Sequence, residues 1–323
     1  MRRPVVPSGM AVERIGVHES TAIDFPYEAL RDELAGVDAD VVSIRDADDE
    51  GADPETCDAF VTFTHQPRLL DVDPEWIHTT FAGVESFPVE EYERRGIALT
   101  NSTGLHGDSV GDTALGMMLA LARRLHDYVA NQQDHHWEFP EWDAPFTLPG
   151  ERVCVVGLGT IGGTVAARCS ALGMEVTGVQ RSEESVEGVD ELFHPENLDD
   201  AIEDARFVVL CVPLTDETEG LLGESEFETM REDAYLVNVA RGEVVDQDAL
   251  VDALREETIA GAALDVFETE PLPEDSPLWD FDDVVVTPHA AAANQAFYRD
   301  IATLVGENLS RLDAGDALKN RVV

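Results

Sequence analysis

A glycine-rich turn constrains the fold of this chain more than any other feature of its sequence. A β-branched run at residues 153–156 is typical of a buried parallel strand, and it leads directly into the turn. A helical pattern follows over residues 164–172, and a second strand is expected over residues 174–179. Strand, glycine turn, helix and strand in this order predict a dinucleotide-binding unit with parallel strands.

The glycines of the turn follow the spacing Gly157-x-Gly159-x-x-Gly162. Gly157 allows the tight turn, Gly159 lets the backbone approach a pyrophosphate, and Gly162 lets helix and strand pack closely. N–H groups at the start of the helix would bind the phosphates, so Thr160 and Ile161 are also expected to contact the cofactor. The alternative is a purely structural turn between packed elements.

The bulk properties of the chain fit a two-domain globular protein. Its 323 residues are enough for two separate cores, and no apolar run reaches the length of a membrane helix. No apolar stretch follows Arg2-Arg3, which argues against a twin-arginine signal, and Met10 is an alternative start. Four scattered cysteines without metal-ligand spacing predict reduced thiols in a cytoplasmic protein: Cys57, Cys154, Cys169 and Cys211.

The charge of the chain is its most unusual bulk property. There are 67 Asp and Glu against 21 Lys and Arg, a net charge of −46, and Lys319 is the only lysine. Such self-repulsion destabilises a folded protein at ordinary ionic strength, whereas molar salt shortens the Debye length to about 3 Å. We therefore expect a protein from a salt-accumulating cytoplasm. The same charge argues against nucleic acids and anionic membranes as partners.

Strands alternate with helical segments on both sides of the turn, which is typical of parallel sheets. The pattern predicts a doubly wound sheet at residues 104–293, inserted into a second domain made of residues 1–103 and 294–323. Strands are expected at residues 14–17, 41–44, 59–64, 77–81, 97–100, 206–212, 235–239, 260–266 and 284–287. Further helices are expected at residues 27–34, 89–95, 105–129, 246–256 and 294–312.

Two short segments could suggest a metal site. The acidic run at residues 46–51 begins like a calcium loop, but Cys57 stands at the twelfth position, where a bidentate Glu belongs. His135 and His136 are adjacent, and adjacent side chains rarely face one ion. We therefore expect no metal.

Three loops that follow strands of the dinucleotide-binding unit carry chemically useful side chains. The first holds Arg241, the second Asp265 and Glu270, and the third His289. Ligands bind at the carboxyl ends of the strands in such sheets, so these groups are expected to converge beside the cofactor. A surface ion pair of Arg241 with Glu270 and a buried histidine are the structural alternatives.

At these motifs the sequence resembles the D-isomer-specific 2-hydroxyacid dehydrogenases, particularly those of halophilic archaea. The resemblance implies a Rossmann domain inserted into a flavodoxin-like substrate domain, and reduction of a 2-keto acid to a D-2-hydroxy acid with NAD(P)H. The alternatives are a glyoxylate or hydroxypyruvate reductase and a non-catalytic, corepressor-like dinucleotide sensor. The matching motifs are the glycine turn, Cys211-Val-Pro213-Leu-Thr215, Val237-Asn-Val-Ala-Arg241-Gly242, Asp265-Val-Phe-x-x-Glu270-Pro271 and Thr287-Pro-His289, within a resemblance from about Trp76 onward.

The resemblance also implies the roles of individual residues. Arg241 would hold the substrate carboxylate through its planar fork. His289 would protonate the keto oxygen as hydride arrives, and Glu270 would orient the imidazole. Backbone N–H groups of Gly83 and Val84 would also bind the carboxylate. Asp265 would meet the nicotinamide carboxamide, and the other implied cofactor contacts are Val212, Pro213, Thr218, Val239, Ala240 and His289.

The end of the second strand bears on cofactor choice. Gln180 stands where a ribose-binding acid usually lies, and Arg181 and Ser182 follow it. Without a carboxylate to bind the 2′-hydroxyl, and with a guanidinium nearby, a 2′-phosphate fits better. We therefore expect NADP(H) to be preferred over NAD(H), with Glu183 and Glu184 facing solvent.

The remaining expectations concern the substrate and the assembly. Val110-Gly111-Asp112 replaces the family's usual Val-Ala-Glu, which puts any substrate contact from that position in doubt. The loop Phe63-Thr64-His65-Gln66, where the family tunes side-chain preference, shows no extra basic group, which favours an aliphatic or aromatic 2-keto acid over a phosphorylated one. The resemblance implies a homodimer, with residues 105–129 and 134–149 at the interface.

Overall fold

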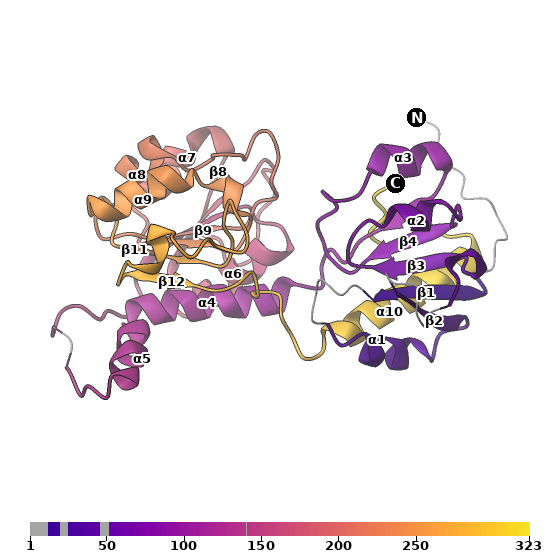
Figure 1. Cartoon of the computed structure of the whole chain (residues 1–323). Coiled ribbons are helices and arrows are strands. Elements are labelled where there is room, and N and C mark those ends of the chain that lie inside the picture. Colours follow the sequence, from indigo (N-terminus) through magenta and orange to yellow (C-terminus); the bar gives the residue numbers. More distant parts are fainter. Residues whose placement is uncertain (1–11, 20–24, 46–51, 140) are drawn as a thin grey trace. The chain divides into compact units, whose positions relative to one another are not determined.

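The structure, a computed structural model, describes residues 12–19, 25–45, 52–139 and 141–323. The acidic run at residues 46–51, the arginine pair at positions 2 and 3, and Met10 lie outside them. The chain divides into two compact units, coloured along the sequence in Figure 1. We call Met1–Leu105 with Asn294–Val323 the split unit, and His106–Ala293 the central unit. The boundaries expected from the sequence are 103/104 and 293/294.

The split unit contains a five-stranded parallel sheet in the order β2-β1-β3-β4-β5, which is the doubly wound order of flavodoxin-like folds. Helices α1 and α10 pack together and share one hydrophobic core with β1 (Figure 1). The strands are β1 (Arg14–Glu19), β2 (Asp40–Arg45), β3 (Ala59–Thr62), β4 (Trp76–Thr79) and β5 (Ala98–Thr100). The helices are α1 (Tyr27–Leu34), α2 (Pro67–Leu70), α3 (Val89–Arg95) and α10 (Phe297–Ala314), with a 3-10 turn at Pro54–Thr56.

The central unit contains a seven-stranded parallel sheet in the order β12-β11-β10-β9-β6-β7-β8. Read from β8, this is the Rossmann order with one added strand, so the predicted α/β fold is confirmed. Its strands are β6 (Arg152–Val156), β7 (Glu175–Val179), β8 (Glu191–Phe193), β9 (Phe207–Leu210), β10 (Tyr235–Asn238), β11 (Gly261–Leu264) and β12 (Val284–Val286). Its helices are α4 (Gly107–Ala122), α5 (Leu125–Gln133), α6 (Thr160–Ala171), α7 (Leu198–Ile202), α8 (Glu224–Thr229) and α9 (Gln247–Arg255), with 3-10 turns at Pro195–Asn197, Gly242–Val244 and Pro277–Trp279.

One continuous helix is expected over residues 105–129, but the structure has two helices there, α4 and α5. That prediction is therefore wrong. The chain breaks between α4 and α5 at Arg124, whose φ is +55°. The guanidinium of Arg124 donates to Asp127 within α5 and pairs with Asp283, which precedes β12. A partner 159 residues away thus fixes the break, which no local periodicity could indicate.

Helix α6 begins four residues earlier than expected, at Thr160. Gly162 therefore lies in its first turn, and a Cβ there would lie 1.8 Å from the carbonyl oxygen of Gly157. Close packing of the helix start onto the turn is possible only because Gly162 has no side chain. The early start also brings the N-terminus of α6 to the glycine turn itself.

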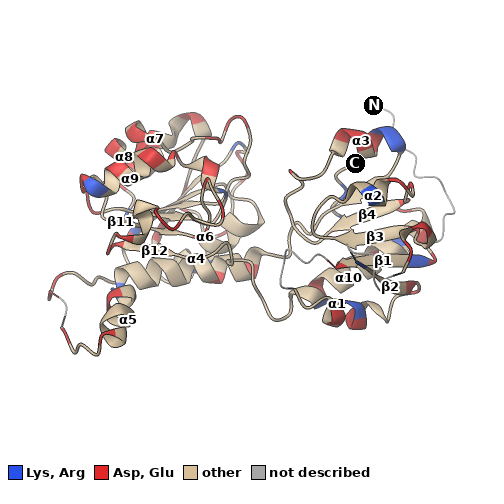
Figure 2. Cartoon of the chain, viewed as in Figure 1, with Lys and Arg blue, Asp and Glu red and all other residues tan. Residues whose placement is uncertain are grey.

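Acidic side chains are spread over the outer helices of both units, as Figure 2 shows for α3 and for α7, α8 and α9. The interior of each sheet is mostly apolar, and β3, β4, β9, β10 and β11 are buried along their whole length. Among the described residues, no helix is long and apolar enough to cross a membrane.

Candidate active site

The glycine turn has the geometry of a phosphate-binding turn. Gly157 has φ +93°, and a Cβ there would lie 2.8 Å from the carbonyl oxygen of Cys211. At Gly159 a Cβ would meet nothing within 4 Å, so the backbone is open on that side. Gly159 is also the N-cap of α6, and Thr160 is exposed. The partly positive helix N-terminus therefore faces an open space that can hold a pyrophosphate.

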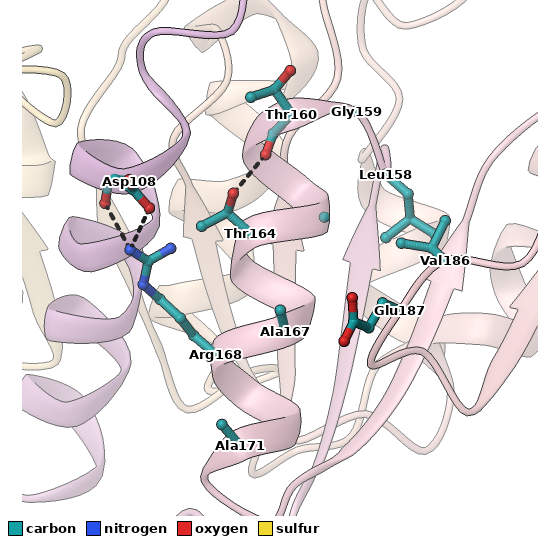
Figure 3. A pocket seen from close by; sticks show the side chains of 11 residues that line it. Asp108, Leu158, Gly159, Thr160, Thr164, Ala167, Arg168, Ala171, Val186 and Glu187 are labelled. Carbon is teal, nitrogen blue, oxygen red and sulfur yellow. Dashed lines mark hydrogen bonds and ion pairs between the residues drawn. The ribbon is translucent and has the colours of Figure 1, made fainter.

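A groove of about 650 Å³ runs from this turn along α6. Figure 3 shows Arg168 reaching from α6 across to Asp108 at the start of α4, and the hydroxyl of Thr164 bonded to Thr160. The groove is lined by Asp108, Leu158, Gly159, Thr160, Gly163, Thr164, Ala167, Arg168, Ala171, Val186 and Glu187.

The same arginine accounts for the unusual Val110-Gly111-Asp112 segment. A Cβ at Gly111 would lie 2.7 Å from Nη1 of Arg168, so the missing side chain makes room for the guanidinium. Arg168 Nε lies 2.9 Å from Asp112 Oδ1. Asp112 is thus engaged in joining α4 to α6, and the shortened side chain has a structural partner.

The loop after β7 brings the three predicted 2′-site residues together. Gln180 Nε2 donates to the carbonyl oxygens of Ser182 at 2.9 Å and Glu184 at 2.7 Å, so its amide shapes the loop. Arg181 Nη2 lies 2.5 Å from Glu217 Oε2, and both side chains are about 70% exposed. Glu183 and Glu184 are exposed. Glu217 was missed in the sequence, where nothing links it to a residue 36 positions away.

The loop after β9 is closed by one of the predicted cofactor residues. Thr218 Oγ1 donates to the carbonyl oxygen of Pro213 at 2.6 Å and accepts from the N–H of Thr215 at 2.8 Å. Val212 is half-buried, whereas Val239 and Ala240 are buried after β10. These residues therefore form the floor and rim at the carboxyl ends of β9 and β10.

Catalytic candidates converge at the carboxyl ends of three neighbouring strands. Arg241 follows β10, Glu270 follows β11 and His289 follows β12. His289 Nδ1 lies 2.7 Å from Glu270 Oε2, and Glu270 Oε1 accepts from the N–H of Phe267 at 3.1 Å. The His289 side chain is about half exposed, so its other nitrogen, Nε2, can face a ligand.

The backbone of Arg241 is fixed from the same strand end. Asn238 Nδ2 donates to the carbonyl oxygen of Arg241 at 2.9 Å, and the guanidinium donates to the carbonyl oxygen of Ala240 at 2.7 Å. Buried His106, at the start of α4, lies in the electrostatic field of Arg241. Burial lowers the pKa of His106, and the charge of Arg241 lowers it further, so both favour the neutral imidazole. Nothing in the sequence indicated that His106 would lie near Arg241, because it is a single histidine in a polar segment.

Asp265 occupies a buried position behind His289. Only 2% of it is exposed, and its carboxylate accepts hydrogen bonds from Thr287, Ala290 and Ala291. The residue predicted to meet the nicotinamide thus bonds mainly to the loop that carries His289.

Gly83 and Val84, predicted to bind a carboxylate, belong to the split unit and lie between β4 and α3. Asn101 Nδ2 donates to the carbonyl oxygen of Ala82 at 2.6 Å and anchors this loop. Next to it, Phe81 is 40% exposed and contacts Phe63 edge-on, with ring centroids 5.0 Å apart. The aromatic contacts continue from Phe63 to Phe25 and Tyr27, and from Phe25 to Phe297.

Potential metal ligands do not gather in the described part of the chain. No group of three or more His, Cys, Asp or Glu side chains there is placed to hold a metal ion. His135 and His136 are both exposed, and His135 has φ +58°.

Comparison with known proteins identifies relatives over most of the chain. The family model for the D-isomer specific 2-hydroxyacid dehydrogenase, NAD binding domain, matches residues 115–291. A glyoxylate reductase of Korarchaeum cryptofilum is 36% identical over 278 aligned positions, and the alignment covers 82% of this chain and 82% of the relative. One of Thermofilum pendens is 38% identical over 267 aligned positions, and the alignment covers 79% of this chain and 78% of the relative.

Solved structures agree with this assignment. The D-isomer specific 2-hydroxyacid dehydrogenase of Xanthobacter autotrophicus Py2, in complex with NADPH and MES, superposes with a TM-score of 0.82 at 30% identity. The match covers 97% of this chain and 98% of that one. An NADPH-dependent glyoxylate/hydroxypyruvate reductase of Sinorhizobium meliloti shares the fold, with a TM-score of 0.79 at 24% identity over 96% of this chain and 98% of that one.

Proposed function

The chain belongs to the D-isomer specific 2-hydroxyacid dehydrogenase family, and we propose on this premise that it reduces a 2-keto acid to the D-2-hydroxy acid with NAD(P)H. The observation that carries the proposal is the 2.7 Å contact between His289 Nδ1 and Glu270 Oε2, at the sheet edge that also holds Arg241. The direct test is the initial rate of NADPH oxidation by wild type and His289→Gln with a panel of 2-keto acids.

We assign the proton to His289 Nε2. Because Nδ1 faces the Glu270 carboxylate, Nε2 is the nitrogen that can face the substrate oxygen. The bound nicotinamide supplies hydride to the carbonyl carbon. His289 then delivers a proton to the keto oxygen, and takes it back in the oxidative direction.

We assign the substrate carboxylate to Arg241 and to the backbone N–H groups of Gly83 and Val84. A guanidinium binds a carboxylate through two parallel hydrogen bonds, which fixes the direction of the keto group as well as its position. The hydrogen bonds of Asn238 and Asn101 support these two elements.

NADP(H) is the preferred cofactor in this proposal. Gln180, Arg181 and Ser182 place an amide, a guanidinium and a hydroxyl at the end of β7, where NAD-binding folds usually present a carboxylate. The NADPH-bound structure of the Xanthobacter autotrophicus relative supports this choice. The test is the ratio of kcat/KM for NADPH to that for NADH.

The substrate in this proposal is an unphosphorylated aliphatic or aromatic 2-keto acid, because the loop at residues 63–66 carries no lysine or arginine and adjoins aromatic rings. The second candidate is glyoxylate or hydroxypyruvate, which the archaeal glyoxylate reductases among the relatives favour. Comparing kcat/KM for glyoxylate, hydroxypyruvate, 2-ketobutyrate and phenylpyruvate decides between them.

The quaternary proposal is a homodimer through the arm, which we define as α5 and the following segment to Phe146. Phe146 anchors the base of the arm, since its ring stacks on Tyr235 and lies 4.2 Å from the guanidinium of Arg206. Farther along the arm, three of the described aromatic side chains are exposed to solvent: Trp137 is 102% exposed, Trp142 87% and Phe139 74%. Figure 1 shows α5 and this segment extending away from the sheet of the central unit. A second copy is the occupant that would cover these rings.

We also propose that the enzyme works in a salt-rich cytoplasm. A net charge of −46 and the scattered, unpaired thiols support this setting. Activity and stability that rise between 0.1 M and molar KCl would agree with it, because salt screens the self-repulsion.

A further inference from the structure

We propose that Asp265 is a positioning residue, whose buried carboxylate holds the loop at residues 287–291 so that the imidazole of His289 stays on Glu270. The inference rests on the proposed function and deepens it. It gives the Asp265 side chain a task that differs from the nicotinamide contact that the family resemblance implies.

The first observation is how completely Asp265 is engaged by the loop. Oδ1 accepts from Thr287 Oγ1 at 2.6 Å and from the N–H of Ala290 at 2.8 Å, and Oδ2 accepts from the N–H of Ala291 at 3.0 Å. All three donors belong to one five-residue loop, and the carboxylate is 2% exposed. Hydrogen bonds to a carboxylate that is shielded from water are stronger than those between neutral groups. These three bonds therefore hold the loop at residues 287–291 in place.

The second observation is the backbone conformation between those donors. His289 has φ +50°, in the left-handed region that residues with a side chain rarely occupy. Its N–H donates to the carbonyl oxygen of Asp265 at 2.8 Å and to that of Thr287 at 3.1 Å. Such a conformation persists only where the surroundings determine it, and here the main chain and the side chain of Asp265 both do so.

The third observation is that Asp265 and Glu270 follow the same strand, β11. Glu270 Oε1 is held by the N–H of Phe267, and Glu270 Oε2 lies 2.7 Å from His289 Nδ1. One loop therefore presents the carboxylate that orients the imidazole and the carboxylate that holds its backbone. If the Asp265 bonds are lost, the strained turn can relax and carry the imidazole away from Glu270.

Asp265→Asn is the first test, because it keeps the shape and leaves one amide oxygen as an acceptor. Its NH₂ group would face an N–H or hydroxyl donor of the loop, so at least one bond is lost. We expect kcat to fall about 100-fold, as for a displaced catalytic group. The dissociation constant of NADPH should change less than about threefold, because a residue that only positions His289 does not contribute to NADPH binding. Asp248→Asn, at an exposed position of α9, is the matched control and should leave both values unchanged.

A double-mutant cycle with Glu270→Gln tests the connection between the two residues. If Asp265 acts through the His289–Glu270 contact, D265N should cost much less activity in the E270Q background than in wild type. Additive effects would overturn the inference. So would a D265N variant that binds NADPH weakly but keeps its kcat, since that result assigns the side chain to the cofactor.

The imidazole N–H resonance of His289 tests the positioning role of Asp265 without relying on activity. The imidazole N–H resonance of His289, assigned by its absence in His289→Gln, should shift in D265N in the same sense as in E270Q. Thr287→Val, which removes one donor and is the milder variant should D265N fold poorly, should shift it partway. If wild type reduces no 2-keto acid, the proposed function fails while this resonance still decides the positioning. An unchanged resonance in folded D265N or T287V would overturn it.

Discussion

Arg181 and Glu217 form an ion pair between the loops that follow β7 and β9 of the central unit, with 2.5 Å between Nη2 and Oε2. Arg181 is the residue proposed to bind the 2′-phosphate of NADPH, and the Glu217 carboxylate faces its guanidinium in the structure. Exposed pairs of this kind contribute about 0–1 kcal/mol, so a doubly charged phosphate group can displace the carboxylate at little cost.

Replacing Arg181 should separate the two cofactors. A charge-assisted hydrogen bond contributes about 1.5–3 kcal/mol, so Arg181→Ala should lower kcat/KM for NADPH about 10- to 100-fold. The value for NADH should be nearly unchanged, which makes NADH the internal control. Glu217→Gln should leave or raise kcat/KM for NADPH. Equal losses for both cofactors in R181A would contradict the assignment.

The contact between Glu270 and His289 predicts a graded loss of catalysis. His289→Gln removes the proton donor and should lower kcat by about 100- to 10,000-fold, the range for general acid–base catalysis. Glu270→Gln keeps a hydrogen-bond acceptor but removes the charge, and should cost less. NADPH binding, measured by fluorescence, should persist in both variants. An E270Q variant with wild-type kcat would exclude Glu270 from the mechanism.

Buried His78 predicts a pH dependence of stability. Its ring nitrogens contact the hydroxyls of Thr100 at 2.8 Å and Ser102 at 3.2 Å, and burial lowers the pKa of His78 from 6.5 to about 3. As pH falls below 6.5, the unfolded chain takes up this proton while the folded chain does not. The free energy of unfolding should therefore fall by up to about 1.4 kcal/mol per pH unit from this group. Above pH 7 the group contributes no slope.

The measurement is denaturant unfolding at pH 7 and pH 5 in molar KCl. His78→Gln should be less stable at pH 7, but its stability should fall less between pH 7 and pH 5 than that of wild type, by about one proton's contribution. An unchanged slope in H78Q would show that another group causes the pH dependence.

The exposed rings of the arm predict a change in assembly. Trp137→Ser with Trp142→Ser should shift sedimentation from dimer towards monomer, because the two indoles supply much of the apolar surface that a second copy would bury. Trp279→Ser removes a half-exposed indole elsewhere in the central unit and should leave the dimer intact. A wild-type monomer, or a dimer that survives the double change, would contradict the proposed interface.

Much of the fold could be predicted from the sequence because its signals are local. The helices at Tyr27–Leu34 and Val89–Arg95 have the predicted bounds, and the apolar runs mark eleven of the twelve described strands to within a few residues. Both sheets are parallel, as the alternation of strands and helices indicates. The short strand β8 was missed, because its three residues carry no periodic pattern.

What the sequence could not provide depends on side chains that meet only in the folded chain. The break at Arg124 is fixed by Asp283, and the partner of Arg181 is Glu217. The loop-holding contacts of Asp265 span more than 20 residues. In a chain this acidic, charge pattern alone cannot indicate which carboxylate has a partner. The site residues stay predictions until variants are measured.

The most direct test is the initial rate of NADPH and NADH oxidation in molar KCl, for wild type and H289Q. Substrates would be glyoxylate, hydroxypyruvate, pyruvate, 2-ketobutyrate, 2-ketohexanoate and phenylpyruvate. We predict turnover of at least one 2-keto acid to the D-product, faster with NADPH and almost lost in H289Q, although the variant still binds NADPH. Tight NADPH binding by wild type without turnover of any keto acid would contradict it and indicate a dinucleotide sensor instead.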